Sequence, residues 1–174
     1  MKVILFGATS VNGIISSHSS NEEFLSDENW VEFIKYVKES GCVILGRKTY
    51  ENLKTWSTSY TNLLNEKNIV KIILSRKLDL KLEDGYVQSS SPEKALNYLS
   101  GRGFTSVILG GGSLINTAFA EKDLIDEIVL DLQSIFISSG KPLFEPREFE
   151  LPVRLIESKN ITEHILQLHY KVRR

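Results

Sequence analysis

In Val107-Ile108-Leu109-Gly110-Gly111-Gly112-Ser113-Leu114, an apolar run is followed by three glycines. The run predicts a buried strand over 106–109, and the residues after the glycines predict a helix from about Leu114 to Ala120. Glycines let a backbone approach a diphosphate closely and leave its N–H groups free. A simple tight turn would not need three of them, because each loses conformational entropy on folding. The stretch therefore predicts an anion-binding turn between a strand and a helix.

Two earlier turns have a similar composition. Gly46-Arg47-Lys48-Thr49 follows an expected strand over 42–45, and Ser75-Arg76-Lys77 follows one over 69–74 that ends at Leu74. Two cations at a helix start oppose the helix dipole, which suggests that an anion compensates them in the first turn. A hydroxyl beside two cations suits a phosphate monoester in the second. A solvated basic turn is the alternative for either motif taken alone.

Strands and helices alternate along most of the chain. Hydrophobic spacing, capping residues and turn residues predict these elements. They are strand 3–6, a loop over 9–22, a helix from Ser26 or Asp27 to Gly41, strand 42–45, a short helix from about Lys48 to Leu53, a polar surface loop from Trp56 to Asn68, strand 69–74, a short strand at Tyr86-Val87, a helix opened by Ser91-Pro92, strand 106–109, the helix to Ala120 and a strand from about Glu127 to Leu132.

The last part of the chain has a different pattern. Segments 151–158 and 163–172 have strand character, and turn residues Asn160 and Thr162 stand between them, which predicts a hairpin. Strands separated by helices imply right-handed crossovers and a parallel sheet. We therefore expect one α/β domain, with a mainly parallel central sheet flanked by helices on both faces and a C-terminal antiparallel hairpin at a sheet edge. Ligands on such sheets bind at the carboxyl ends of the strands.

Composition excludes several classes of function. The chain has 174 residues, a formal net charge of -1 and a pI near 6.3, so no global field favours nucleic acid or an anionic membrane. The apolar start is too short for a signal peptide and no stretch approaches a bilayer span, so a cytoplasmic location is expected. The single cysteine, Cys42, is expected to be a buried, inert thiol. His18, His164 and His169 lack metal-ligand spacing, so no metal is expected and the last two are interpreted as exposed strand residues.

Familiar phosphate loops and hydrolase turns do not match. The glycine run lacks the Gly-Lys-Ser or Gly-Lys-Thr of a Walker A loop, and Ile115 stands where a dinucleotide fingerprint has its third glycine or alanine. The chain also contains no Gly-x-Ser-x-Gly turn.

The order of the motifs resembles the dihydrofolate-reductase-like superfamily, especially the branch related to the reductase domain of riboflavin biosynthesis. The resemblance spans nearly the whole chain. It rests on residues 8–15, 43–51, 73–76 and 107–114, and on the stretches Asp123-Leu124-Ile125-Asp126-Glu127-Ile128-Val129-Leu130 and Gly140-Lys141-Pro142-Leu143-Phe144, which favour the riboflavin-type branch.

The resemblance implies that NADPH lies across the strand ends. A 2′-phosphate offers a dianion to Arg76 and Lys77, which favours NADPH over NADH on charge grounds as well. The implied cofactor contacts are Ala8 and Ile15 beside the nicotinamide, Gly46, Arg47, Lys48 and Thr49 at phosphates, Leu74, Ser75, Arg76 and Lys77 at the adenosine phosphate, and Gly110, Gly111, Gly112, Ser113 and Leu114 at the diphosphate.

Acidic residues depart from the family pattern at two places. Asn12 stands where the riboflavin-type pattern prefers aspartate, and it keeps the hydrogen bonds of the turn but cannot ionise. Trp30 lies near the position where folate enzymes carry an acid on the first helix, with Asp27 about one turn earlier. Asp131 interrupts an apolar strand and is either a buried carboxylate facing the pocket or an outward residue at the strand end.

The resemblance implies hydride transfer from NADPH to a C=N or related carbonyl carbon of a small heterocyclic or ribosylamino substrate. Asp27, Asp131 or water would supply the accompanying proton. Asn12 belongs to the expected substrate side of the site, and the candidates for an apolar wall, each of which could equally be core, are Trp30, Ile34, Tyr50, Leu53 and Trp56.

Two alternatives stay open at this point. One is true dihydrofolate reduction, and the other is a non-catalytic module that binds NADPH as a sensor or scaffold. Relatives in the superfamily are often dimeric, and an exposed apolar terminal hairpin would fit a homodimer. No nucleic-acid or membrane partner is expected.

Overall fold

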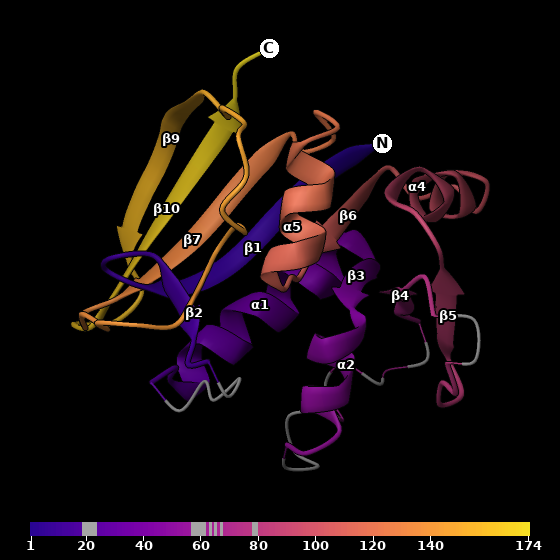
Figure 1. Cartoon of the computed structure of the whole chain (residues 1–174), viewed down its shortest axis with the longest axis horizontal. Coiled ribbons are helices and arrows are strands. Elements are labelled where there is room, and N and C mark those ends of the chain that lie inside the picture. The colour runs from indigo at the N-terminus through magenta and orange to yellow at the C-terminus, as the bar shows by residue number, and fades with distance from the viewer. Residues whose placement is uncertain (19–23, 57–61, 63, 65, 67, 78–79) are drawn as a thin grey trace.

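A mixed sheet of order β5-β4-β3-β6-β1-β7-β10-β9 runs through the molecule (Figure 1). The computed structural model describes residues 1–18, 24–56, 62, 64, 66, 68–77 and 80–174. The strands are β1 (Lys2–Ser10), β2 (Ile14–Ser16), β3 (Cys42–Gly46), β4 (Val70–Leu74), β5 (Tyr86–Ser89), β6 (Ser106–Leu109), β7 (Glu127–Gln133), β8 (Lys141–Pro142), β9 (Val153–Asn160) and β10 (Ile165–Val172), and the helices are α1 (Asp27–Ser40), α2 (Arg47–Leu53), α4 (Pro92–Ser100) and α5 (Ser113–Ala120).

The strands from β5 to β7 are parallel, and the sheet ends in an antiparallel hairpin. β1 pairs in parallel with β6 and β7, and β3 pairs in parallel with β4 and β6. β10 is antiparallel to both β7 and β9, so β9 is the edge strand. The predicted α/β fold, with its parallel sheet and terminal hairpin, is confirmed.

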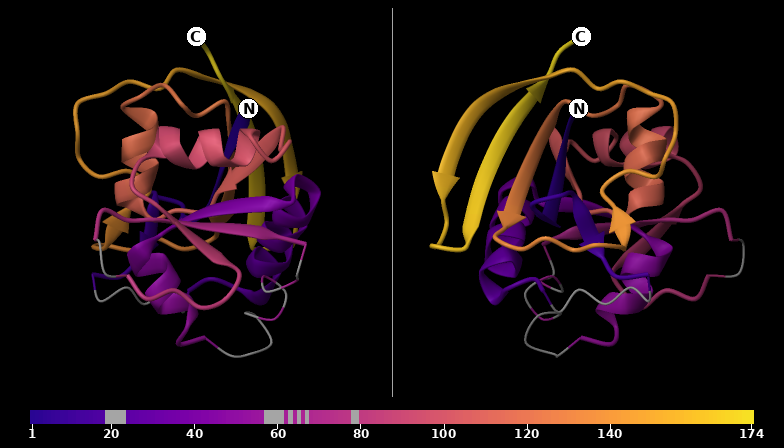
Figure 2. Two further views of the ribbon diagram at one scale, coloured as in Figure 1. Left: turned by 90° about the vertical axis from the view of Figure 1, so that its right-hand side faces the viewer. Right: turned by 60° about the vertical axis from the view of Figure 1, so that its left-hand side comes forward.

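Helices cover both faces of this sheet. Phe33, Ile34 and Val37 of α1 pack in one core cluster together with Tyr50 of α2. The opposite cluster contains Ala95 and Leu99 of α4 and Ile115 and Phe119 of α5. In the right-hand view of Figure 2, α1 and α5 lie on opposite sides of the strands. None of the helices in the described residues is long and apolar enough to cross a membrane.

Helix ends follow their local sequence signals. Gly41 ends α1 with φ 72, a left-handed conformation that glycine adopts without steric cost. The Ser91 hydroxyl accepts a hydrogen bond of 3.3 Å from the Lys94 N–H at the start of α4, as the Ser91-Pro92 pair predicted.

Cys42 is fully buried, and burial raises its pKa to about 11, which keeps the thiol neutral.

The expected loop over 9–22 is wrong in part. β1 continues to Ser10, because Thr9 and Ser10 pair with Leu132 and Gln133 of β7, which satisfies their backbone groups. A second short strand, β2, then pairs with β8. The polar composition of this segment concealed strand pairing that depends on residues more than 100 positions away.

Two smaller expectations also change. His169 is not an exposed strand residue, because its side chain is 19% exposed and its Nε2 lies 3.0 Å from Glu127 Oε2. The expected surface loop from Trp56 to Asn68 lies largely outside the described residues, and Leu64 within it is buried.

Candidate active site

The three predicted turns meet in one pocket at the carboxyl ends of the parallel strands. Its volume is about 730 Å³, within the range of small-molecule sites. Residues from the end of β3 and from α2, from the end of β4 and the turn after it, and from α5 form most of its wall, and β2 and β8 close one side. Of the expected cofactor residues, those that line it are Ile15, Gly46, Arg47, Lys48, Thr49, Leu74, Ser75, Arg76, Lys77, Gly112, Ser113 and Leu114.

The three glycines of the run have three different reasons to be glycine. A Cβ on Gly110 would lie 2.7 Å from Leu45 Cδ2, so this residue is required by core packing. Gly111 has φ +84, which side chains rarely adopt. A Cβ on Gly112 would meet only Thr49 Oγ1, at 3.5 Å. Gly112 is therefore the glycine whose missing side chain opens the pocket rather than the core.

Backbone hydrogen bonds fix the glycine run against the first turn. The Gly46 N–H donates to the Gly111 carbonyl at 2.7 Å, and the Gly110 N–H donates to the Ile44 carbonyl at 2.9 Å. The peptide bond between Gly111 and Gly112 is cis. Gly110 and Gly111 therefore do not line the pocket but support its wall. The first backbone N–H groups of α5, which have no hydrogen-bond partner within the helix, lie at the surface of the pocket.

The Ser75-Arg76-Lys77 turn is held by a residue that sequence reasoning missed. Gln88 of β5 donates through Nε2 to the Ser75 carbonyl at 3.1 Å and to the Lys77 carbonyl at 2.6 Å. The Ser75 hydroxyl accepts from the Lys77 N–H at 3.1 Å. Arg76 and Lys77 are exposed, and neither forms an ion pair with another residue that the structure describes. The turn is rigid in its backbone and leaves two cations available to an anion.

The side chains of two other expected phosphate ligands have protein partners. Arg47 donates to both carboxylate oxygens of Glu51, at 2.7 and 2.9 Å, within α2. The Ser113 hydroxyl donates to the Pro142 carbonyl and ties α5 to β8. Lys48 remains exposed beside them. Lys48, Arg76 and Lys77 therefore contribute exposed positive charge to the pocket, which Lys122 and Lys141 also line.

This donor set fits a phosphorylated dinucleotide. An N-terminal helix turn, an unobstructed glycine backbone and exposed cations on two neighbouring strand ends are the features that bind phosphates in α/β proteins. Ser16, Asn52, Ser90 and Ser91 add polar lining that the sequence alone did not single out. Ser16 ends β2, Asn52 lies in α2, and Ser90 and Ser91 precede α4, so their place in one pocket depends on tertiary structure.

Asp131 is a buried carboxylate and not an outward residue at the strand end, but it does not line the cofactor pocket. Its side chain has no exposed surface. Oδ2 accepts from Asn29 Nδ2 at 3.0 Å, and Oδ1 accepts from Gln167 Nε2 at 2.8 Å. Burial raises the pKa of Asp131, although these two hydrogen bonds act to lower it. Asp131 pairs in register with Ala8 of β1 and so lies one strand from the position expected for the nicotinamide.

The partners of Asp131 form a network that sequence reasoning missed. Asn29 Oδ1 accepts from the Ser26 N–H at 3.3 Å and from Gln133 Nε2, so its amide nitrogen must face Asp131. Gln167 Oε1 accepts from the Tyr36 hydroxyl at 3.2 Å, so the amide nitrogen of Gln167 must also face Asp131. Residue 131 therefore faces two N–H donors and must supply two acceptors. Asn29, Gln133 and Gln167 are each at most 5% exposed.

The other expected substrate residues divide between core and surface. Ile34, Tyr50 and Leu53 are buried in the core cluster on the α1 face. The rings of Trp30 and Trp56 are half-buried and meet edge to face, with centroids 5.3 Å apart. Of the five proposed wall residues, the two tryptophans are the ones that reach the surface.

The two polar candidates outside the network are exposed. Asn12 donates through Nδ2 to the Ile137 carbonyl at 2.8 Å and accepts from the Ile137 N–H at 3.1 Å, so it joins two loops. Asp27 is exposed in the first turn of α1.

Across the described part of the chain, no group of three His, Cys, Asp or Glu side chains could hold a metal ion.

Comparison with known proteins agrees with this architecture. A family model described as the RibD C-terminal domain matches residues 1–167. The chain belongs to the RibD C-terminal domain family. Members of this family are generally pyrimidine reductases that use NADPH. The chain is 25% identical over 177 residues to the uncharacterized protein YwjB of Bacillus subtilis (strain 168), and the match covers 97% of each.

Two solved structures with low sequence identity share the fold. The Thermotoga maritima diaminohydroxyphosphoribosylaminopyrimidine deaminase/5-amino-6-(5-phosphoribosylamino)uracil reductase superposes with a TM-score of 0.79 and 17% identity, over 99% of this chain and 56% of that one. Dihydrofolate reductase of Enterococcus faecalis, in a complex with NADP(H), superposes with a TM-score of 0.72 and 17% identity, over 99% of this chain and 97% of that one.

Proposed function

We propose that this chain is an NADPH-dependent reductase that transfers a hydride to a C=N or carbonyl carbon of a small heterocyclic or ribosylamino compound. One observation carries the proposal: three turns from separate parts of the sequence form a single basic pocket at the strand ends. Bound NADPH would supply the hydride, and the protein would supply orientation and a dry surrounding. The family supports a pyrimidine derivative as the substrate.

The pocket residues would divide the cofactor between them. Gly112 and the first turn of α5 would hold the diphosphate through backbone N–H groups. Arg76 and Lys77 would hold the 2′-phosphate, where an arginine makes two parallel hydrogen bonds to phosphate oxygens. Ala8 and Ile15 would flank the nicotinamide.

Asp131 is our candidate for the group that handles the proton. A carboxyl group with a raised pKa retains its proton closer to neutral pH, and such a group can donate to a nitrogen that becomes basic as the hydride arrives. Two amide donors fix its oxygens, so Asn29 and Gln167 would act as positioning residues. Asp27, by contrast, is exposed at the helix surface.

The direct test is NADPH oxidation with defined substrates. We expect oxidation with 5-amino-6-(5-phosphoribosylamino)uracil to exceed that with dihydrofolate. Faster oxidation with dihydrofolate would instead identify a true dihydrofolate reductase. Tight NADPH binding without oxidation of NADPH by either compound would favour a non-catalytic binding module.

Replacement of Arg76 by alanine should reduce the preference for NADPH over NADH at least about tenfold, because a charge-assisted hydrogen bond contributes roughly 1.5–3 kcal/mol. Affinity for NADH, which lacks the 2′-phosphate, should hardly change. Competitive fluorescence titration of both nucleotides measures this. Arg102→Ala, at an exposed arginine beyond α4, is the matched control. An equal loss of affinity for both nucleotides in Arg76→Ala would contradict the assignment of the 2′-phosphate.

A homodimer through the terminal hairpin is also proposed. β9 is an edge strand, and Leu155, Ile156 and Leu166 of the hairpin are 50%, 43% and 38% exposed. Unpaired edges that carry apolar side chains favour association. Sedimentation should show a dimer for the native chain and a monomer for Leu155→Lys, which puts a charge on the edge strand. A native chain that sediments as a monomer at micromolar concentration would rule out this interface.

A further inference from the structure

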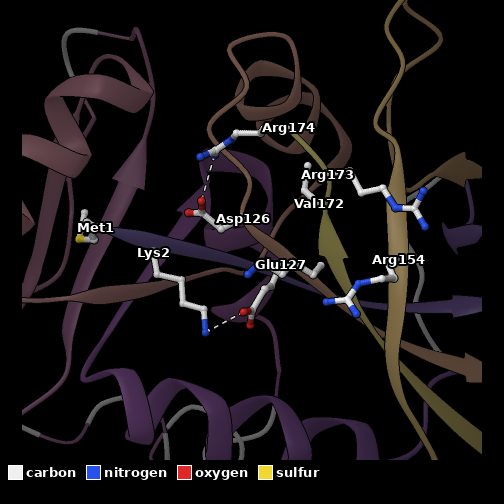
Figure 3. A pocket seen from close by; sticks show the side chains of 9 residues that line it. Met1, Lys2, Asp126, Glu127, Arg154, Val172, Arg173 and Arg174 are labelled. Atoms are coloured by element: carbon white, nitrogen blue, oxygen red, sulfur yellow. Dashed lines mark ion pairs between the residues drawn. The ribbon is translucent and has the colours of Figure 1, made fainter.

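The edge of the sheet opposite the cofactor pocket carries a second concentration of positive charge. A cavity of about 870 Å³ lies there, formed by the start of β1, the start of β7, the start of β9 and the end of β10. Figure 3 shows Arg154 reaching from β9 toward Glu127, while Lys2 and Arg174 turn to carboxylates. The charged residues that line it are Lys2, Asp126, Glu127, Arg154, Lys171, Arg173 and Arg174.

The pairing of the strands places two of these cations directly opposite each other. Lys171 of β10 pairs in register with Arg154 of β9 on one side and with Glu127 of β7 on the other. Residues directly opposite in neighbouring strands project on the same face of the sheet, and like charges in such a pair destabilise it. The backbone pairing holds the Cβ atoms of the two residues close together, just beyond an irregularity of the ladder between His169 and Tyr170.

The neighbouring carboxylates do not compensate these cations, because they already have partners. Glu127 lies 2.8 Å from Lys2 and 3.0 Å from His169. Burial acts to raise the pKa of Glu127, but its hydrogen bonds with Lys2 and His169 hold that pKa below its ordinary value. Asp126 pairs with Arg174 at 3.0 Å and accepts from the Val3 N–H at 2.8 Å. Within the described part of the chain, Arg154, Lys171 and Arg173 form no ion pair.

The charge balance of this cavity is opposite to that of the whole chain. Five cationic and two anionic side chains line it, which leaves a net charge of +3 in a chain with a formal net charge of -1. Two of the three uncompensated cations are arginines, whose planar guanidinium groups bind phosphate oxygens in pairs. The volume is suited to a small molecule.

We propose that this cavity is a second anion site, in which Arg154, Lys171 and Arg173 bind a small molecule that carries two or more phosphate groups. The site is distinct from the cofactor pocket, because it lies at the amino ends of β1 and β7 whereas the cofactor pocket lies at the carboxyl ends of β3 and β4. Its ligand supplies the negative charge that the Lys171–Arg154 pair lacks. The inference does not depend on the proposed reductase activity.

Inorganic tripolyphosphate is a suitable probe, with NADP⁺ present in excess to fill the cofactor pocket. In a titration followed by amide NMR at low ionic strength, we expect saturable shifts at residues 126–127, 153–155 and 171–173. The double variant Arg154→Gln, Lys171→Gln should bind tripolyphosphate at least about tenfold more weakly, since each charge-assisted hydrogen bond contributes more than 1 kcal/mol. Lys81→Gln, at an exposed lysine that does not line the cavity, should bind it as the native chain does.

The melting temperature is a second readout, in which the substitution and the ligand have separate effects. Without tripolyphosphate, Arg154→Gln should raise the melting temperature, because it removes the like-charge pair. With tripolyphosphate, the native chain should gain melting temperature and the double variant should not. Equal binding by the double variant, or shifts confined to residues 46–49, 75–77 and 110–114, would overturn the proposal. Binding of a DNA oligonucleotide at these residues without any binding of tripolyphosphate would also overturn it.

Discussion

Replacement of Asp131 by asparagine is expected to lower kcat for NADPH oxidation about 100-fold, the lower end of what a general acid contributes. The amide keeps the size of the side chain but removes the exchangeable acid proton. Affinity for NADPH should be unchanged, because Asp131 does not line the cofactor pocket. Steady-state kinetics and cofactor titration on the same preparation measure the two effects separately.

The burial of Asp131 also predicts the direction in which kcat changes with pH. Burial raises the folded-state pKa of Asp131, so the protonated form persists to a higher pH than in an exposed aspartate. We expect kcat of the native chain to fall as the pH rises through this pKa, and the step should be absent in the variant. The stabilisation from the protonated group is likewise complete below the unfolded-state pKa and is lost as the pH rises through the folded-state pKa.

The same substitution should reduce stability. An asparagine at position 131 turns an N–H group toward either Asn29 Nδ2 or Gln167 Nε2, which are themselves donors. One unsatisfied buried donor costs about 1–3 kcal/mol in the free energy of unfolding. Asp27→Asn, the same change at an exposed acid in the first turn of α1, should leave kcat unchanged and lower the free energy of unfolding by less than about 1 kcal/mol. A large loss of kcat in Asp27→Asn with little in Asp131→Asn would reverse our assignment.

Alanine at two positions of the glycine run should have opposite consequences. Gly112→Ala adds a methyl group where only Thr49 Oγ1 is near, so we expect little loss of stability and at least about tenfold weaker NADPH binding, as a close diphosphate–backbone approach is blocked. Gly110→Ala adds a methyl group 2.7 Å from Leu45 Cδ2 and 3.0 Å from the Phe33 ring. Overpacking of this kind costs roughly 1–3 kcal/mol.

Urea unfolding and NADPH titration of both variants check this pair. Each variant is the control for the other, because the two changes are chemically identical and two residues apart. If Gly112→Ala binds NADPH as tightly as the native chain, the diphosphate does not lie against this backbone, and the glycine has another explanation.

Local patterns were sufficient to predict the parallel part of the fold. The apolar runs before Gly46, Ser75 and Gly110 are buried strands, and each is followed by the turn that its residues predicted. Because parallel strands all end at one edge of the sheet, the predicted strands also implied that the three turns lie close together. This is why most of the cofactor pocket could be predicted from the sequence.

Contacts between distant segments could not be predicted in the same way. β2 pairs with β8 through Ile14 and Pro142, two short segments with no strong strand pattern of their own. The sequence also left the direction of Asp131 open, since apolar residues on both sides of it hide the phase of the strand. The structure resolves this through Asn29 and Gln167, which lie 102 and 36 positions away.

Titration of the native chain with NADPH shows whether the three turns bind a nucleotide. Trp30 and Trp56 are half-buried and in contact with each other, so tryptophan fluorescence is available as a reporter. We predict saturable quenching, and at about 100 times the dissociation constant a stabilisation of roughly 2.7 kcal/mol. Absence of both quenching and thermal stabilisation at millimolar NADPH would contradict the claim that the three turns form a nucleotide site.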